Sequence, residues 1–391
     1  MLCNCPKQTF PILDANSYEV NSRSTVIETF KPNRSAMMFF RIVGHVNIRT
    51  IDIDAGGHEA PPLQVIVTSP KSVGVPLVGT LAISPASQRE KQAIGGYKIV
   101  KELGAGGYGQ VFLAENAQGK QIAIKVMLAE VAATPAKVKM FEREIDNAKA
   151  LNHPNVVRLT DNGFDPGNNC LYYAMEYCAG ENLSTFIHKM GGILDLPLTK
   201  RLIFQILDGL EYTHNAEIPY VRLADGSFGK GIGLVHRDLK PSNIMIAKSN
   251  LGQVAKIGDF GLAKAFDMAG LSGHTMSGDG FRGTPHFMCR KQVLEFQQAK
   301  PEVDIWAAAA CLYYVLTNQY PRKFGKGEGW EILLERDVIP IRDRNPDLPA
   351  PLAIVIDRAL HEGSKTSTTL HYQRVQDFKA DLSIAFTEIL D

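Results

Sequence analysis

The sequence contains, at residues 236–243, the run His236-Arg237-Asp238-Leu239-Lys240-Pro241-Ser242-Asn243, and Asp259-Phe260-Gly261 follows it after an apolar stretch. In the first run an aspartate, a lysine two residues later and an asparagine five residues later come from one loop. All three side chains can therefore point at a single site. The second aspartate follows on a Phe-Gly turn. Together the two runs supply a base, a cation and two oxygen ligands, which is the set that metal-assisted phosphoryl transfer requires.

A glycine cluster lies upstream of these runs, at Gly104-Ala105-Gly106-Gly107-Tyr108-Gly109. Glycines allow the backbone to approach phosphate oxygens and to adopt conformations that a Cβ would forbid. A dinucleotide-binding site uses the same spacing but opens a helix, whereas Gln110–Leu113 continues here as a strand. Taken alone, the cluster leaves a glycine-rich hairpin turn and a phosphate-binding loop equally open.

Lys125 lies inside the predicted apolar strand Gln121–Leu128, and Glu144 lies on the next predicted helix, Pro135–Leu151. An inward-facing pair of these residues would hold the ammonium against phosphate oxygens. As an isolated pair on the surface, the same two residues would contribute almost nothing to stability. Their role therefore depends on the neighbouring motifs.

From about residue 97 to about residue 385 the chain resembles the eukaryotic-like, bacterial-type Ser/Thr protein kinases. The resemblance implies an α+β fold of two lobes, a small β-rich N-lobe and a large helical C-lobe, which binds Mg-ATP between them. It also implies that ATP and Mg²⁺ are the cofactors, with Mn²⁺ as a substitute for the metal.

The resemblance assigns a role to each motif. For the nucleotide, it implies that Gly104, Gly106 and Gly109 cover the phosphates and that Val111 and Ala123 contact the adenine. It also implies that Met175 is the gatekeeper and that Glu176 and Cys178 form the hinge. For catalysis, it implies Lys125 on the α/β-phosphates paired with Glu144, Asp238 as acceptor of the substrate hydroxyl proton, Lys240 at the transferring phosphoryl, and Asn243 and Asp259 on Mg²⁺.

The expected substrate is the Ser or Thr hydroxyl of a protein. The loop form Leu239-Lys240-Pro241-Ser242-Asn243 and the later Gly283-Thr284-Pro285 resemble the Ser/Thr kinases of the family rather than its tyrosine kinases. We therefore expect phosphorylation of protein substrates, the chain itself included, in intracellular signalling. Ser272, Thr275 and Ser277 lie either in an activation segment that is ordered by phosphorylation or in a polar flexible loop. Both interpretations remain open.

The chain has 391 residues, which leaves room for two or three domains. Residues 1–94 show alternating runs at Met37–Val43, Val46–Asp52 and Gln64–Thr68, which predict a β-rich extension that ends in a linker. Strands at Tyr97–Leu103, Gln110–Glu115, Gln121–Leu128 and Leu171–Tyr177 place the N-lobe and hinge at 95–179. Helices at Asn182–Met190, Thr199–His214, Val303–Thr317 and Leu352–His361 place the C-lobe at 180–391.

One segment departs from the family pattern at the end of the expected activation segment. Cys289, Arg290 and Lys291 stand where the family has Ala-Pro-Glu, and His371 stands where the partner arginine of that glutamate is expected. Since both halves of the family's buried ion pair have changed, we expect a different anchor here, without loss of catalysis. A pseudokinase or signalling scaffold that binds partners is the alternative.

A second departure is an insertion, because 21 residues separate His214 from His236. Its Asp225-Gly226 pair predicts a hairpin turn between two short strands. The insertion at 216–233 is either a tolerated surface hairpin or, like residues 1–94, a docking element for a partner.

The composition argues against several other classes. Lys and Arg number 42 against 41 for Asp and Glu, so the charge balance does not indicate nucleic-acid binding. The longest strongly apolar stretch, Ile305–Leu316, is shorter than the ~18–20 residues of a membrane span. Six scattered cysteines are typical of a reducing compartment. We therefore expect a cytoplasmic protein with neither a membrane span nor a signal peptide.

Overall fold

The computed structural model divides the chain into two units, Met1–Glu90 and Lys91–Asp391. It describes residues 17–19, 26–29, 40–42, 64–67, 77–80, 93–106, 109–128, 135–168, 170–223, 227–250, 252–260, 285–295, 300–325, 331–363 and 369–390. The domain limits expected at residues 94 and 179 stay predictions.

The first unit contains short strands. β1 (Ser17–Glu19), β2 (Val26–Thr29) and β3 (Phe40–Ile42) pair antiparallel in that order, and β4 (Gln64–Val67) pairs with β5 (Leu77–Thr80). The β-rich character expected of this region is confirmed. Two of the predicted runs overlap β3 and β4, and the third, Val46–Asp52, lies outside the described residues.

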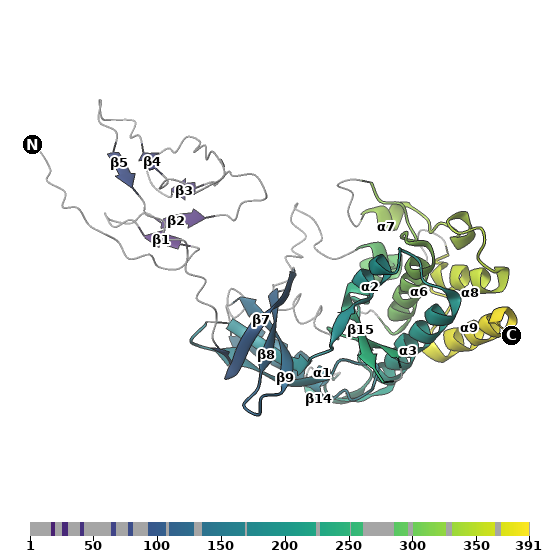
Figure 1. The fold of residues 1–391 in the computed structure, drawn as a ribbon, viewed down its shortest axis with the longest axis horizontal. Helices are drawn as coiled ribbons and strands as arrows, with labels where there is room; N and C mark the ends of the chain where they lie inside the picture. The colour runs from purple at the N-terminus through teal and green to yellow at the C-terminus, as the bar shows by residue number, and fades with distance from the viewer. Residues whose placement is uncertain are drawn as a thin grey trace, which may run out of the picture. The chain divides into compact units, whose positions relative to one another are not determined.

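The second unit begins with a sheet of six antiparallel strands in the order β10-β11-β9-β8-β7-β6 (Figure 1). The strands are β6 (Ala93–Ile94), β7 (Tyr97–Gly106), β8 (Gly109–Glu115), β9 (Gln121–Leu128), β10 (Leu159–Asp165) and β11 (Cys170–Glu176), and α1 (Pro135–Lys149) connects β9 to β10. The sequence predicts β7, β8, β9 and β11 but not β10. In this edge strand only Leu159 is buried, so the apolar run that marks β9 and β11 is missing.

Alternation along β9 gives this sheet two different faces. Ile122, Ile124 and Val126 pack into a small apolar cluster on one face. Met127 points to the other face, where it joins the large core of the helical part. Because Lys125 lies between Ile124 and Val126, its side chain points to this second face, toward the helical part.

The rest of the second unit is mainly helical. Its helices are α2 (Leu183–Lys189), α3 (Leu196–Asn215), α5 (Arg290–Leu294), α6 (Glu302–Thr317), α7 (Glu331–Glu335), α8 (Ala350–Leu360) and α9 (Val375–Leu390), with single turns at Pro241–Asn243, Pro285–Phe287 and Ile341–Asp343. A small sheet has the order β12 (Gly180–Asn182), β15 (Ile244–Ser249), β16 (Gly252–Ile257), and β13 (Glu217–Arg222) pairs with β14 (Phe228–Ile232).

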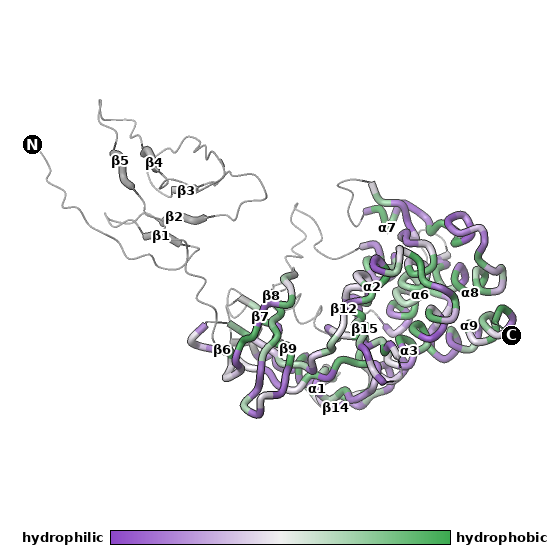
Figure 2. Tube along the Cα trace, in the orientation of Figure 1, coloured by the Kyte–Doolittle hydropathy of each residue, from purple (hydrophilic) through white to green (hydrophobic). Residues whose placement is uncertain are grey.

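Helix α6 is the centre of this helical part. Nearly all of its side chains are buried, as expected for a helix that is apolar on every side. Helices α3, α8 and α9 contact it, and Trp306 Nε1 donates to the Leu360 carbonyl of α8 at 3.1 Å. Figure 2 shows hydrophobic residues recurring through these helices. The rigid core places Asp304, at the start of α6, beside the loop that carries Asp238.

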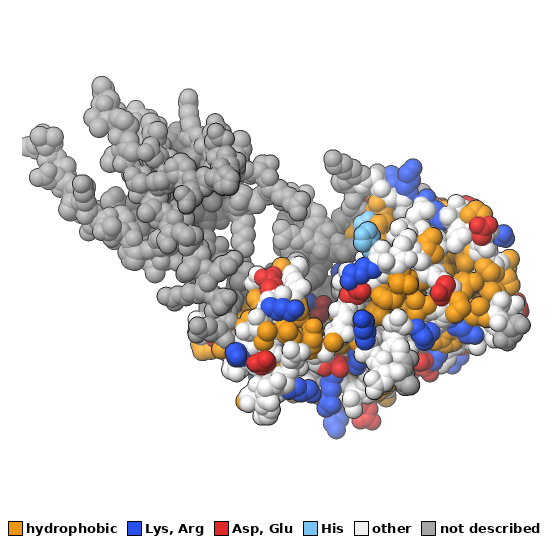
Figure 3. Space-filling model, viewed as in Figure 1, with side chains coloured by type: hydrophobic (Ala, Val, Ile, Leu, Met, Phe, Trp, Pro, Cys, Tyr) orange, Lys and Arg blue, Asp and Glu red, His pale blue; other side chains and the backbone are white. Residues whose placement is uncertain are grey.

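Two surface properties of the described residues complete the fold. None of the helices among them is both long and apolar enough to cross a membrane. On the face shown in Figure 3, Lys and Arg side chains are interspersed with Asp and Glu.

Candidate active site

The loop that follows β14 is held by the buried carboxylate of Asp304. The backbone N–H groups of His236 and Arg237 donate to its two oxygens at 2.7 and 2.8 Å, and His214 Nε2 donates to it at 2.8 Å. Burial opposes ionisation of Asp304, but the bond from His214, nearby His236 and the Arg237 N–H outweigh it and lower the pKa of this carboxyl. Arg237 itself takes a left-handed conformation with φ of 66°. The carboxylate of α6 therefore determines the path of the loop.

Asp238, Lys240 and Asn243 converge, as their spacing in one loop predicts. Lys240 Nζ lies 2.8 Å from Asp238 Oδ2. Asn243 Nδ2 donates to the Asp238 carbonyl at 2.7 Å and to Asp238 Oδ2 at 3.1 Å. The Asp238 carboxylate is therefore oriented by a cation and an amide.

Asp259 lies next to this loop because two bonds connect the loop to the end of β16. The Gly258 N–H donates to the Asn243 carbonyl at 2.8 Å, and His236 Nε2 donates to the Gly258 carbonyl at 2.8 Å. The following residue, Asp259, takes a left-handed conformation with φ of 59°. This turn directs its carboxylate toward the sheet.

Lys125 and Asp259 meet at the junction of the sheet and the helical part. Lys125 is 7% exposed, and its Nζ lies 2.7 Å from Asp259 Oδ2. Burial opposes ionisation of Asp259, but the charge of Lys125 and hydrogen bonds from Lys125 and Tyr173 outweigh it and lower the pKa of the carboxyl. Asp259 is therefore an ionised, hydrogen-bonded acceptor.

The ion pair that Lys125 forms differs from the one expected. In this structure its partner is Asp259 and not Glu144, which lies half-buried on α1. The physical reason is the direction of Asp259, whose left-handed turn brings a half-buried carboxylate within hydrogen-bond distance of the β9 lysine. Two opposite charges that are partly shielded from water attract each other more strongly than they would in bulk water.

Tyr173 is a site residue that the sequence analysis missed. It lies directly opposite Lys125 in the β9–β11 pairing, and directly opposed residues share a face of the sheet. Its hydroxyl donates to Asp259 Oδ1 at 2.8 Å, and Lys125 Nζ lies 5.9 Å from its ring centroid. Burial, followed by the charge of Asp259, raises the pKa of Tyr173 well above its ordinary value, so it stays a donor. The pair Tyr172-Tyr173 could have indicated this residue, since neighbours on a strand face opposite sides and one of the two tyrosines must therefore point to the face of Lys125.

Asn243 and Asp259 fit the metal that the family implies. The Asn243 amide nitrogen is used on Asp238, so its carbonyl oxygen is the group that remains for a cation. Asp259 adds an ionised carboxylate. The described residues contain no cluster of three or more His, Cys, Asp or Glu that would hold a metal alone. Two protein oxygens with the other ligands from phosphates and water is the pattern of Mg²⁺.

The glycine cluster forms the tip of the β7–β8 hairpin. Gly104 pairs with Val111 and Gly106 with Gly109, while residues 107–108 lie outside the described residues. Gly109 has φ of 136°, and a Cβ there would lie 2.0 Å from the Val126 carbonyl oxygen. Glycine is therefore required at 109 by the hairpin itself, and this observation does not distinguish a turn from a phosphate loop.

The expected adenine residues share the face of Lys125. Val111 pairs with Lys125, and Ala123 pairs with Met175 across β9 and β11. After Met175, the N–H of Glu176 donates to the Arg158 carbonyl at 2.9 Å. Burial raises the pKa of the Cys178 thiol to about 11, so this thiol is protonated at neutral pH.

The end of the activation segment has a different anchor, built from reversed charges. The Arg290 N–H and the Arg322 guanidinium both bond the buried carboxylate of Glu362, and Arg290 Nε donates to the Leu333 carbonyl at 3.0 Å. Lys291 Nζ lies 2.9 Å from Glu302 Oε1 of α6. Glu362, and not His371, is thus the residue that faces this segment.

Comparisons with known proteins agree with this geometry. The model of the protein kinase domain matches residues 97–365. The chain is 32% identical over 279 residues to the tyrosine-protein kinase MasK of Myxococcus xanthus, which covers 69% of this chain and 40% of that protein. It is 30% identical over 298 residues to the serine/threonine-protein kinase PknB of Mycobacterium tuberculosis, with coverage of 73% and 42%. The chain spans less than half the length of these curated relatives.

Among solved structures, the kinase domain of Mycobacterium tuberculosis PknI is similar with a TM-score of 0.54 and 20% sequence identity, over 74% of this chain and 96% of that chain. At this identity the similarity shows the fold, and the predicted two-lobed architecture is confirmed. Because the protein kinase domain model matches well over half of the residues, including every motif discussed above, the chain belongs to the protein kinase family.

Proposed function

We propose that this chain is a protein kinase that transfers the γ-phosphoryl group of Mg-ATP to Ser and Thr hydroxyls of proteins, itself included. The observation that carries the proposal is the convergence of Asp238, Lys240 and Asn243 beside the ion pair of Lys125 and Asp259. A base, two cations and two oxygen ligands meet at one place. Lys125 comes from the sheet, and the other four residues come from the helical part. Positioning and charge neutralisation are the main sources of catalysis in phosphoryl transfer.

Each residue has a defined task in this proposal. The Asp238 carboxylate, oriented by Lys240 and Asn243, accepts the proton of the substrate hydroxyl. Lys240 lies beside this base and neutralises charge on the transferring phosphoryl group. Lys125 leaves Asp259 to bind the α/β-phosphates. Mg²⁺, or Mn²⁺ in its place, would be held by Asn243 and Asp259 and would neutralise charge on the phosphates.

The nucleotide positions follow from the shared face of β8, β9 and β11. Val111, Ala123 and Met175 would contact the adenine, with backbone groups of Glu176 and Cys178 at the hinge. Gly104, Gly106 and Gly109 would cover the phosphates. Glu144 would form an ion pair with Lys125 once the Lys125 ammonium has left Asp259. A cytoplasmic location is part of the same proposal and rests on the cysteine usage.

The acceptor residue requires a direct test, since one curated relative is named a tyrosine kinase and another a serine/threonine kinase. Purified chain is incubated with radiolabelled ATP, Mg²⁺ and a generic basic protein, beside the isosteric variant Asp238→Asn. We expect label on phosphoserine and phosphothreonine after acid hydrolysis, reduced by at least about a hundredfold in the variant. Label on phosphotyrosine would overturn the assignment of Ser and Thr as the acceptors. Nucleotide binding without any label would favour the scaffold alternative.

A further inference from the structure

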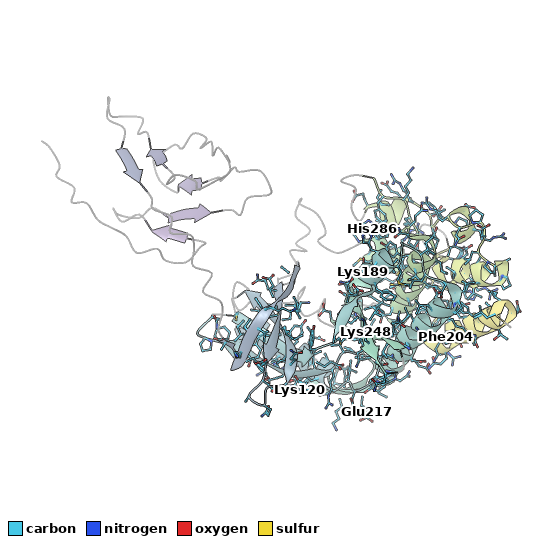
Figure 4. The ribbon with its side chains drawn as sticks, in the orientation of Figure 1. Lys120, Lys189, Phe204, Glu217, Lys248 and His286 are labelled. Carbon is cyan, nitrogen blue, oxygen red and sulfur yellow. The ribbon has the colours of Figure 1, made fainter. Side chains whose placement is uncertain are left out.

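The insertion between α3 and the Asp238 loop packs against α1. It forms the predicted hairpin, β13 with β14, while residues 224–226 at its turn lie outside the described residues. Ile218 is 4% exposed and belongs to the large apolar core. Strand β13 contacts α1, and Figure 1 shows α1 and β14 side by side. Figure 4 labels Glu217 at the start of β13. The hairpin is therefore part of the packed structure and not a free surface loop.

A β-bulge in the hairpin leaves one residue available to α1. The pairing passes from Ile218 opposite Gly231 to Val221 opposite Gly229, so two residues of β13 face one residue of β14. The extra backbone groups belong to Tyr220. The Tyr220 N–H donates to Asn147 Oδ1 at 2.9 Å, and Asn147 Nδ2 donates to the Tyr220 carbonyl at 2.9 Å.

This pair of hydrogen bonds is partly buried and specific. Asn147 is 3% exposed, and its carboxamide bonds both backbone groups of one residue, as a neighbouring strand would do. A carboxylate could accept from the Tyr220 N–H but could not donate to its carbonyl. Asn is thus a residue type that satisfies both groups at once.

A second contact lies one helical turn earlier. Arg143 and Asn147 are four residues apart and share a face of α1. The Arg143 guanidinium carbon lies 3.9 Å from the ring centroid of Phe228, the first residue of β14. Both strands of the hairpin therefore contact the same face of the helix.

The other end of the hairpin is held against the end of α3 and leads into the catalytic loop. The Gly233 N–H donates to the Ala216 carbonyl at 2.9 Å, and the Leu234 N–H donates to the Thr213 carbonyl at 2.8 Å. His236, whose N–H is held by Asp304, lies two residues after Leu234. The hairpin thus connects α1, which carries Glu144, with the loop that carries Asp238.

We propose that the β13–β14 hairpin is an internal clamp, in which Asn147 and Arg143 are positioning residues that hold α1 at a set distance from the catalytic loop. The clamp sets the position of α1, which carries Glu144, relative to the loop that carries Asp238, without help from a second protein. This inference rests on the proposed function. It assigns the insertion a role within the chain, in place of docking to a partner.

The first test is Asn147→Asp, which keeps the shape and removes one hydrogen bond, with Asn152→Asp at an exposed position as the matched control. A second variant, Arg143→Met, keeps the stem and removes the guanidinium, with the exposed Lys139→Met as its control. We expect kcat to fall about tenfold in each clamp variant, because α1 is held less firmly when the Tyr220 carbonyl loses its donor or the cation stacked on Phe228 is lost. The Kd for Mg-ADP should change less than about threefold, because neither residue contacts the nucleotide positions.

Amide hydrogen exchange provides a readout that does not depend on activity. In the clamp variants, residues 135–149 should exchange faster, while α6 should keep the protection of the unmodified chain. Wild-type exchange across α1 together with wild-type kcat in both clamp variants would overturn the clamp. Faster exchange with unchanged kcat would show a structural contact that does not position the site, and would also overturn it.

A combined variant tests whether Asn147 affects kcat through the hairpin. When a short Gly-Ser linker replaces residues 217–232, Asn147→Asp should produce no further loss of kcat, because its partner is already gone. An equal further loss in that background would show that Asn147 acts through another element. If the linker chain fails to fold, the point variants still decide the question. If the unmodified chain shows no phosphotransfer, the proposed function fails, and the exchange measurements alone still test the clamp contact.

Discussion

At the scale of single residues, Asp259, the proposed acidic ligand of Mg²⁺, has two partners with different roles. Lys125 compensates its charge, and Tyr173 donates to the other oxygen, so both oxygens of the carboxylate have a set direction. Because the tyrosine ring is fully buried, its hydroxyl has little freedom to move away. Residues that orient a metal ligand affect metal affinity even though they never contact the metal.

Replacing Tyr173 by Phe removes only this hydroxyl. We expect the affinity for Mg-ADP to fall about tenfold while the affinity for metal-free ADP stays nearly constant, because the loss falls on a metal ligand. Isothermal titration calorimetry with and without Mg²⁺ measures both.

Tyr172→Phe is the matched control, since Tyr172 is the neighbouring residue and faces the small apolar cluster on the opposite side of the sheet. Equal effects of the two substitutions on Mg-ADP affinity would contradict the role of Tyr173.

At the scale of elements, the start of α5 shows how an anchor can be kept while the charges of its ion pairs are reversed. Arg290 and Arg322 surround Glu362, and Lys291 pairs with Glu302. Gln292 Nε2 also donates to the Arg237 carbonyl, which ties α5 to the catalytic loop. Each cation is compensated where it is buried. A changed motif is therefore compatible with an ordered site, and it does not by itself favour a scaffold function.

Lys291→Glu tests this anchor. The new carboxylate would face Glu302, whose side chain is 3% exposed, and Glu295. A buried charge that loses its partner costs about 3–5 kcal/mol, so the free energy of unfolding should fall by about 3 kcal/mol or more. Urea denaturation measures it, with the exposed Lys300→Glu as control. Equal unfolding midpoints for the variant and the unmodified chain would show that the pair does not anchor the segment.

At the scale of the whole molecule, the second unit, Lys91–Asp391, contains the two apolar clusters described above. The kinase unit, residues 91–391, therefore has a core of its own. A unit with its own core folds independently of its neighbour in sequence.

Removal of residues 1–90 should leave a chain that melts within a few degrees of the full chain and binds Mg-ADP with the same Kd. Differential scanning calorimetry and titration of the two chains give the comparison. A melting temperature lowered by more than ten degrees or so would mean that the first unit contributes to the kinase core. Reduced phosphorylation of a protein substrate with unchanged autophosphorylation would instead assign recognition to residues 1–90.

Much of the fold could be predicted because its signals are local. The strands β9 and β11 are continuous apolar runs, the helices α3 and α8 have apolar residues at helical spacing, and α6 is apolar throughout. The edge strand β10 lacks such an apolar run. Helix α9 was missed although Val375, Phe378, Leu382 and Phe386 recur at helical spacing. The hairpin of the insertion was predicted from its Asp-Gly turn, but its contact with α1 was not.

The sequence alone determined the chemistry of the catalytic loop. Asp238, Lys240 and Asn243 are two to five residues apart, and one turn is enough to bring them together. Tertiary structure decided the partners of Asp259, Tyr220 and Glu362, because Tyr173 is 86 residues from Asp259, Asn147 is 73 residues from Tyr220, and Arg290 is 72 residues from Glu362. Such pairs depend on strand register, a bulge and the packing of whole helices, which no local spacing encodes.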